Sequence, residues 1–472
     1  MLRNSRILCK FAYKTKIEAH GFISNTLNCC RYDVVSNVTT KVKDKKLTMR
    51  ILIVNTSERT GGAAVAANRL MEALKNNGVK AKMLVVNKTS DQLTVVGLSH
   101  QWLQRWRFLW ERFTVFCHLH FSKNNLFAID IANTGADITS LPEFREADLI
   151  HLSWINQGML SLSDIKKIVK SGKPVVWTMH DLWPATAICH YARQCAMFKT
   201  GCHNCRLLPG GGSANDLSSK VWRKKKALYH NSNIQFVTCS RWLEAQAKQS
   251  GLFIGQRVCN IPNPIDSRIY APADRREARL KMGLPAEGRV ILFVAQRVDD
   301  ERKGVAFFIE AINRLAASSP QFADTTSVAV IGKNSEQIAD EIKIRTFALG
   351  TISGSHAMAA AYNAADVFVL PSLEDNLPNT IMESMACGVP CVGFRVGGIP
   401  EMIDHRRNGY IANFKDTADL AAGISWVLTE ADHDSLSHEA RNKVLHCYSQ
   451  QNVAAQYVEV YNEMIAQKTY RI

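Results

Sequence analysis

The stretch that decides the fold runs from Asp366 to Asn413 and reads DVFVLPSLEDNLPNTIMESMACGVPCVGFRVGGIPEMIDHRRNGYIAN. Its first apolar run, Val367 to Leu370, ends at a Pro-Ser pair and predicts a buried strand. After a polar loop, Asn379 is the expected N-cap of a helix over residues 380–387. A second apolar run, Cys391 to Phe394, predicts the next strand. Strand, loop, helix and strand in such short succession indicate a parallel α/β unit.

The loop and the start of that helix carry two carboxylates, Asp375 and Glu383, eight residues apart. Open α/β sheets bind ligands at this edge, where loops and helix N-termini present free N–H groups. A helix N-terminus facing a diphosphate, with carboxylates that accept hydrogen bonds from sugar and ribose hydroxyls, would make a nucleotide-sugar site. The alternative is two solvated acids around an N-cap.

This stretch resembles the signature of the family 4 glycosyltransferases, which are retaining enzymes of the GT-B fold. The matching segments are Pro371-Ser372, Asp375-x7-Glu383, Ala386-Cys387-Gly388-Val389-Pro390-Cys391-Val392, and Gly397-Gly398 followed by Glu401. The resemblance implies that Glu383 holds the ribose hydroxyls and that the following residues also contact the donor: Asn376, Leu377, Pro378, Asn379 and Thr380. The first acid of the signature is Asp375, with Glu374 beside it, so both are candidates for the catalytic acid that faces the donor sugar.

The resemblance covers the chain from about Met49 to its end and implies two Rossmann-like, doubly wound domains that face each other across a cleft. We expect an acceptor-binding domain over residues 49–265 and a nucleotide-sugar-binding domain over residues 266–445. A helical segment over residues 446–472 is expected to cross back to the first domain. The alternation of strands and helices supports the α/β fold independently.

Residues 1–48 contain ten Lys or Arg and three Asp or Glu, a net charge of +7 out of +16 for the chain. We expect a non-native or disordered extension, with translation starting naturally at Met49, because no apolar core of a signal peptide is visible. A basic targeting segment is the alternative. The charge of the remainder suits an anionic donor or a membrane surface, and the absence of a nucleic-acid-binding motif argues against nucleic acid. The sequence contains no run of about 18 apolar residues, which is the length that would predict a transmembrane helix.

A glycine pair, Gly61-Gly62, follows the first predicted strand and opens a helix. Glycine lets backbone N–H groups approach a phosphate or a sugar closely, although a tight turn needs the same residues. The resemblance favours a donor-binding loop here. In the resembling family a histidine after a later strand lines the cleft, which makes His180 the catalytic candidate and His151 the second choice. A satisfied core histidine is the usual alternative.

A Lys303-Gly304 pair precedes a predicted helix of the second domain, where the resembling family binds the donor diphosphate with a lysine and an arginine. Such cations stabilise the leaving group as charge grows on it. Arg297 and Arg302 are rival candidates for the arginine. The resemblance implies that the active site needs no metal. The alternative interpretation of these cations is that they are exposed loop residues.

Four cysteines, Cys189, Cys195, Cys202 and Cys205, lie within 17 residues. A Cys-x2-Cys pair with two further cysteines suits a tetrahedral zinc ion, and four thiolates leave no open position, so the predicted zinc is structural. In a reducing cytosol zinc is favoured over disulfides.

Residues 101–127 combine aromatic with basic side chains, as helices at a membrane interface do. The residues are Trp102, Arg105, Trp106, Arg107, Phe108, Leu109, Trp110, Arg112, Phe113, Phe116, Phe121 and Lys123. An amphipathic helix packed on its own domain explains the pattern equally well, so a peripheral membrane contact stays open.

The sequence thus predicts a cytoplasmic, retaining hexosyltransferase at the inner face of the membrane, which moves a sugar from a nucleotide-diphosphate sugar to an acceptor hydroxyl. The Asp375–Thr380 segment and the cysteines look most like those of bacterial exopolysaccharide and colanic-acid-type transferases, which implies a lipid-linked or oligosaccharide acceptor. The main alternative is a non-catalytic nucleotide-sugar-binding module. A phosphorylase or an epimerase shares the scaffold, while a glycoside hydrolase needs two acids astride a glycosidic bond and has no use for a diphosphate-binding loop.

Overall fold

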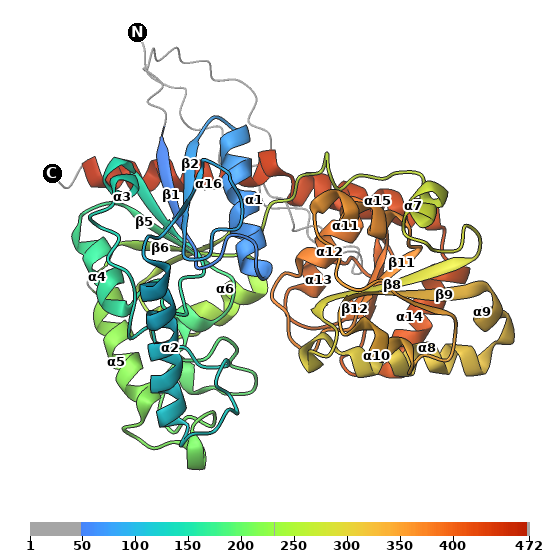
Figure 1. Cartoon of the computed structure of the whole chain (residues 1–472), viewed down its shortest axis with the longest axis horizontal. Helices are drawn as coiled ribbons and strands as arrows, with labels where there is room; N and C mark the ends of the chain where they lie inside the picture. Colours follow the sequence, from blue (N-terminus) through green and yellow to red (C-terminus); the bar gives the residue numbers. More distant parts are fainter. Residues whose placement is uncertain (1–48, 231, 470–472) are drawn as a thin grey trace, which may run out of the picture. The chain divides into compact units, whose positions relative to one another are not determined.

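The structure is a computed structural model that describes residues 49–230 and 232–469. The expectations for residues 1–48 therefore lie outside the described residues. Within the described part, the chain forms two parallel α/β domains, each built on one sheet (Figure 1).

The sheet of the first domain has the strand order β3-β2-β1-β4-β5-β6-β7, and all pairs are parallel. The strands are β1 (Arg50–Val54), β2 (Lys80–Val85), β3 (Val95–Gly97), β4 (Leu149–Leu152), β5 (Val175–Met179), β6 (Ile234–Thr238) and β7 (Arg257–Asn260). Strands β4, β5 and β6 are buried along their whole length, as is typical of parallel strands covered on both faces.

Helices cover both faces of this sheet. Helices α1 (Gly62–Asn76) and α16 (Gln450–Thr469) contribute to the core on one face. The core on the other face includes residues of α2 (Gln101–His118), α3 (Pro142–Glu146), α4 (Leu162–Lys170), α5 (Leu217–His230) and α6 (Arg241–Lys248).

The sheet of the second domain has the order β10-β9-β8-β11-β12-β13, again with all pairs parallel. The strands are β8 (Arg289–Arg297), β9 (Thr326–Lys333), β10 (Thr346–Ala348), β11 (Val367–Leu370), β12 (Cys391–Phe394) and β13 (Gly409–Ala412). One core includes α8 (Val305–Ser318), α9 (Pro320–Thr325), α10 (Ser335–Ala339) and α14 (Thr417–Thr429). The other includes α7 (Arg275–Lys281), α11 (Ser355–Asn363), α12 (Asn379–Ala386), α13 (Ile399–Met402) and α15 (His433–Cys447). Figure 1 shows α8, α10 and α14 below this sheet and α7, α11, α12 and α15 above it.

In each sheet the strand order reverses between two neighbours, β1 and β4 in the first and β8 and β11 in the second. Loops that follow such strands diverge and leave a crevice at the carboxyl edge, where open α/β sheets bind ligands. The arrangement confirms the prediction of two Rossmann-like, doubly wound domains.

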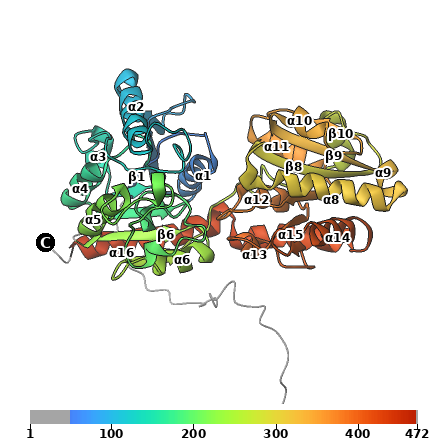
Figure 2. The same cartoon turned by 90° about the horizontal axis from the view of Figure 1, so that it is seen from below.

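The last helix, α16, crosses back to the first domain, as predicted (Figures 1 and 2). Its buried side chains join the core that contains β1 and α1. The Tyr461 hydroxyl is hydrogen-bonded to Nδ1 of His151 at 2.5 Å, and Nε2 of His151 lies 2.9 Å from the Thr178 hydroxyl. His151 is fully buried between these partners, so it is a core histidine rather than a ligand-binding one.

The helix of the organising stretch begins one residue earlier than predicted. Asn379 is the first residue of α12, and Pro378 occupies the N-cap position without a side-chain cap. Proline needs no N–H partner and has a fixed φ, which suits a helix start. The Asn379 amide is therefore available for a contact with another part of the chain.

Among the helices of the described residues, none combines the length and the apolar character that a membrane crossing requires.

The contact between α16 and His151 generates a prediction about pH and stability. Burial, and then the neighbouring His180, lower the pKa of His151 from 6.5 to about 3. The unfolded chain takes up a proton that the folded chain rejects, so the free energy of unfolding should fall as the pH drops from 6.5 towards 3. In His151→Asn we expect the free energy of unfolding to fall less steeply with decreasing pH than in the wild type, by about 1.4 kcal/mol per pH unit. Chemical denaturation of both proteins across this interval checks the slopes, and equal slopes would contradict the prediction.

Candidate functional site

A pocket of about 310 Å³ opens at the carboxyl edges of both sheets, with walls from the loops after β1, β5, β7, β8 and β11. The predicted site residues that line it are Gly62, His180, Arg297, Arg302, Lys303, Asp375, Asn376, Leu377, Pro378, Asn379 and Thr380. Gly61, Glu374 and Glu383 are not among the lining residues. The structure thus brings most of the predicted donor-binding residues of both domains to one place.

Lys303 and Asp375 form an ion pair on the pocket wall. The Lys303 Nζ lies 2.6 Å from Oδ2 of Asp375, and the Ser372 hydroxyl donates to the same oxygen at 3.2 Å. Both side chains of the ion pair are largely buried, which strengthens a charge–charge contact relative to one in open water. An ammonium group has three N–H donors, so Lys303 retains donors for a second anionic partner.

Glycines allow the backbone around Asp375 to pack more closely than any side chain would permit. Gly304 has a φ of 71°, and a Cβ there would lie 1.9 Å from the carbonyl oxygen of Pro371. A Cβ at Gly397 or Gly398 would lie 1.7 Å or 2.0 Å from the carbonyl oxygen of Asp375 or Asn376, respectively. Two turns therefore pack directly against the loop that carries Asp375: the turn with Lys303 and the turn at Gly397-Gly398.

The two neighbouring acids of the signature have different surroundings. Asp375 lines the pocket, whereas the Glu374 carboxylate lies 3.4 Å from Nε of Arg193 and outside the lining. Burial raises the pKa of Glu374, and the nearby Arg193 opposes this shift. In this geometry Asp375 is the acid that faces the ligand space.

Glu383 is engaged by two partners away from the pocket lining. Arg69 of α1 donates to its Oε1 at 2.6 Å, and the Tyr362 hydroxyl donates to its Oε2 at 2.8 Å. The sequence pattern does not reveal Arg69 or Tyr362 as partners, because their proximity to Glu383 depends on the tertiary fold. Contact of Glu383 with ribose hydroxyls stays a prediction. It would use the carboxylate oxygens of Glu383, which already accept hydrogen bonds from Arg69 and Tyr362.

Each arginine of the pocket has a carboxylate partner of its own. Arg297 is 2.8 Å from Asp299, and Arg302 is 3.1 Å from Asp300. Arg302 also lies over the ring of Tyr191, 5.5 Å from its centroid. Both arginines line the pocket, so both remain candidates for contact with a diphosphate.

His180 lines the pocket as a neutral imidazole at physiological pH, because burial lowers its pKa to about 4. Its Nε2 lies 2.9 Å from the Ser153 hydroxyl, and its Nδ1 lies 3.4 Å from the Cys239 sulfur. A neutral imidazole contributes hydrogen bonds without adding a positive charge.

Two asparagines join the acidic loop to the first domain. The Asn376 side chain accepts a hydrogen bond from the Ser240 hydroxyl and donates to the carbonyl of His180 at 3.1 Å. The Asn379 amide donates to the carbonyl of Gly62 at 3.0 Å. Further lining residues that the sequence interpretation missed are Ala63, Asn263, Val294, Ala295, Gln296 and Asp300, and their positions near strand ends were the only signal for them.

The four cysteines of the predicted zinc site lie near one another, since electrostatic interactions link Cys189 with Cys195, Cys202 and Cys205. Burial raises the pKa of Cys189 to about 11 and that of Cys202 to about 12, and it lowers the pKa of the neighbouring Lys225 to about 7. However, the described residues include no group of three or more His, Cys, Asp or Glu side chains arranged to hold a metal ion. The zinc therefore stays a prediction.

Comparisons with known proteins find similarity over part of the chain. Residues 288–430 match a protein-family model described as "Glycosyl transferases group 1". N-acetyl-alpha-D-glucosaminyl L-malate synthase of Bacillus anthracis is 26% identical over 214 residues, which are 43% of this chain and 53% of that protein. D-inositol 3-phosphate glycosyltransferase of Geodermatophilus obscurus is 31% identical over 198 residues, which are 39% of this chain and 43% of that protein. The chain thus spans about half the length of the curated relatives it matches.

Solved structures share the fold over most of the chain. Sucrose-phosphate synthase from Thermosynechococcus elongatus has a TM-score of 0.60 at 17% identity, covering 89% of this chain and all of that one (100%). HepE of Anabaena, solved in complex with UDP-glucose, has a TM-score of 0.57 at 15% identity, covering 88% of this chain and 100% of that one. These similarities confirm the predicted GT-B fold.

The cysteine cluster yields a prediction that elemental analysis checks. Protein purified without added metal should contain about one zinc per chain, because four neighbouring cysteines that include a Cys-x2-Cys pair suit a tetrahedral zinc ion. Substitution of Cys202 and Cys205 by serine should release the metal and lower the melting temperature. The matched control is Cys447→Ser, which lies outside the cluster and should leave the zinc content unchanged. A stable, zinc-free protein with four titratable thiols at these positions would refute the site.

Proposed function

We propose that the protein is a retaining glycosyltransferase, which moves a sugar from a nucleotide-diphosphate sugar to an acceptor hydroxyl. The observation that carries the proposal is the Lys303–Asp375 ion pair on the wall of a pocket lined by both domains. A cation suited to a diphosphate and a carboxylate suited to sugar hydroxyls thereby lie side by side. The match of residues 288–430 to group 1 glycosyl transferases supports the proposal.

In the proposed reaction, Lys303 binds the donor diphosphate together with Arg297 or Arg302. Negative charge grows on the diphosphate as its bond to the anomeric carbon breaks, and fixed cations stabilise that charge. The start of α12, whose residues Asn379 and Thr380 line the pocket, presents N–H groups without a side-chain cap, and these favour an anion. These groups supply the positive charge that a metal ion provides in other enzymes.

The remaining polar groups of the pocket suit the two sugars. Asp375 accepts hydrogen bonds from hydroxyls of the donor sugar. The wall of the first domain, with Gly62, Ala63 and the neutral His180, lies across the pocket and is the proposed side of entry for the acceptor.

For the acceptor we propose a lipid-linked or oligosaccharide intermediate of cell-surface polysaccharide synthesis, formed at the inner face of the membrane. The support is the resemblance of the Asp375–Thr380 segment and the cysteines to exopolysaccharide and colanic-acid-type transferases. Two relatives carry L-malate and inositol 3-phosphate in their names, so small hydroxyl acceptors belong in the same assay.

The test is a panel of UDP- and GDP-sugars assayed for release of the nucleoside diphosphate, without and with acceptors. NMR of the product, compared with the donor, reads the anomeric configuration. A protein that binds these donors tightly and consumes none of them would be a nucleotide-sugar-binding module instead. Dependence of turnover on inorganic phosphate would identify a phosphorylase.

We predict that Lys303→Ala raises the donor KM and lowers kcat, because the ammonium contacts the diphosphate both before and during bond cleavage. The loss of such a contact costs about 2–4 kcal/mol, or about 30- to 1,000-fold in kcat/KM. Steady-state kinetics with the preferred donor measures it. The matched control is Lys281→Ala, an exposed lysine of α7, which should leave kcat/KM unchanged. An unaltered kcat/KM in Lys303→Ala would refute the assigned role.

We also predict that Asp375→Asn lowers kcat strongly and leaves nucleotide affinity nearly unchanged, because Asp375 faces the sugar rather than the nucleotide. Glu374→Gln is the matched control, since its carboxylate is outside the pocket lining and beside Arg193. Donor turnover and UDP or GDP binding by calorimetry separate the two effects. The reverse result, with turnover lost only in Glu374→Gln, would show that Glu374 is the acid that faces the sugar.

A further inference from the structure

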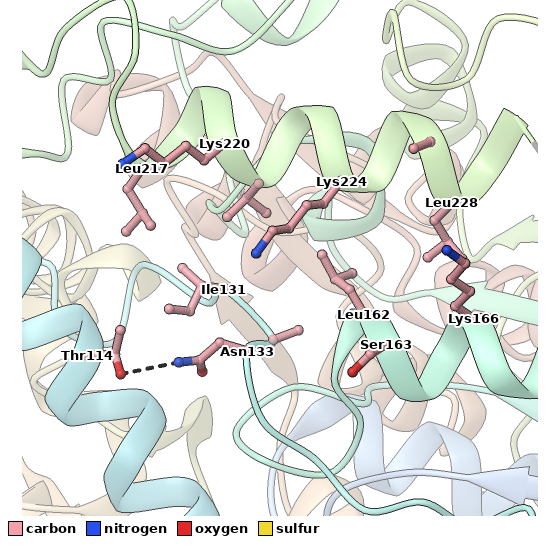
Figure 3. Close-up of a pocket in the computed structure, with 13 residues that line it drawn as sticks. Thr114, Ile131, Asn133, Leu162, Ser163, Lys166, Leu217, Lys220, Lys224 and Leu228 are labelled. Carbon is pink, nitrogen blue, oxygen red and sulfur yellow. Dashed lines mark hydrogen bonds between the residues drawn. The ribbon is translucent and has the colours of Figure 1, made fainter.

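A second pocket, of about 540 Å³, lies in the first domain between α2, α4 and α5, apart from the candidate active site. Its apolar wall is formed by Ile131, Leu162, Leu217, Val221 and Leu228. Three lysines also line it: Lys166 of α4, and Lys220 and Lys224 of α5. Figure 3 shows Lys224 reaching from α5 into the space between the helices.

The charge of this pocket is uncompensated. No Asp or Glu belongs to its lining, and no ion pair of Lys166, Lys220 or Lys224 occurs within residues 49–230 and 232–469. The outer surface of α5 carries further basic residues, Arg223 and Lys226, and both are exposed. An apolar wall beneath unpaired ammonium groups suits a molecule with an anionic head and an apolar tail.

The neighbouring helix α2 exposes a row of large apolar side chains. Trp102, Trp106, Leu109, Trp110 and Phe113 recur at helical spacing on one face, and each is between 52% and 64% exposed. The buried residues of α2 are instead mostly polar, namely Gln104, Glu111, Arg112 and Val115. Thr114 of the same helix lines the lysine pocket and is hydrogen-bonded to Asn133 at 3.2 Å (Figure 3). The aromatic row and the pocket are therefore adjacent parts of one surface.

We propose that this surface binds an anionic lipid bilayer. The aromatic row of α2 enters the interface between headgroups and acyl chains, where tryptophan is favoured. The pocket holds one anionic phospholipid, with its phosphate on Lys224 and the upper part of an acyl chain on the apolar wall, while Lys220 and Lys166 at the two ends of the pocket face neighbouring headgroups (Figure 3). This inference does not depend on the proposed transfer reaction, because no donor or acceptor takes part in the binding.

The charge on the surface argues against two other occupants. A second copy of the chain, docked through the same face, would bring the lysines of two α5 helices towards each other without acidic partners. Residues 1–48 carry a net charge of +7, so they would also place positive charge beside these lysines. A negatively charged bilayer complements both the lysines and the aromatic row.

The experiment is flotation of the full chain with vesicles of phosphatidylcholine alone and with vesicles that also contain phosphatidylglycerol. We expect the protein to float only with the anionic vesicles. The triple variant K166Q/K220Q/K224Q should reduce vesicle binding about 100-fold, since each lysine near an anionic surface contributes about 1 kcal/mol. The variant W106S/W110S should also lose binding, and its tryptophan emission should no longer shift to shorter wavelength on addition of anionic vesicles.

Matched controls separate this surface from general charge and apolarity. The variant K80Q/K281Q/K343Q removes three exposed lysines elsewhere, and I254S/L280S removes two exposed apolar side chains elsewhere. Both should float as the wild type does. Lys303→Ala should float normally too, which distinguishes this inference from the proposed catalysis. Melting temperatures equal to that of the wild type establish that the variants are folded.

Several results would overturn the proposal. Equal flotation with neutral and anionic vesicles would exclude a contribution of the lysines to membrane binding. If the control variants lost as much vesicle binding as the test variants, this surface would be excluded as the binding site. Stabilisation by inorganic phosphate without any flotation would identify a site for a free anion. Self-association of the wild type that W106S/W110S abolishes, again without flotation, would identify an interface between copies of the chain.

Discussion

The candidate site depends on a steric constraint, the contact of glycine backbone with the loop that carries Asp375. Gly304 packs on Pro371, while Gly397 and Gly398 pack on the carbonyl groups of Asp375 and Asn376. A methyl group at any of these positions would overlap a carbonyl oxygen, so the loop has no room to be displaced in that direction. The position of Lys303 relative to Asp375 follows from this packing, since the lysine immediately precedes Gly304.

Hydrogen bonds to the first domain also hold the segment that contains this loop. Asn376 and Asn379 bond to the first domain at His180 and Gly62, and Glu401 accepts the backbone N–H groups of Arg241 and Trp242 at the start of α6. Arg69 of the first domain reaches Glu383 of the second. The segment recognised first in the sequence is thus the segment through which the second domain contacts the first.

The sequence predicted the sheets, the crossing helix and most of the pocket lining, because each depends on a local pattern. Apolar runs mark strands, and the signature around Asp375 lies within one α/β unit. It did not predict that Arg69 and Tyr362 bind Glu383, since that contact depends on how distant helices pack. For the aromatic segment of α2 the sequence left two interpretations open, a membrane interface and a face packed on its own domain. The structure exposes the aromatic face and buries the charged pair Glu111 and Arg112 with Asp130.

The pocket is close to electrical balance, although it is lined by three cations. Arg297, Arg302 and Lys303 each contact an aspartate, namely Asp299, Asp300 and Asp375. A chloride or a single carboxylate therefore gains little there, because each cation already has an anionic neighbour. A diphosphate would meet all three cations at once, and the Lys303 ammonium has donors for it besides the one directed at Oδ2 of Asp375. In the proposed reaction one ammonium group would therefore link the charge of the diphosphate to the position of the carboxylate that meets the sugar.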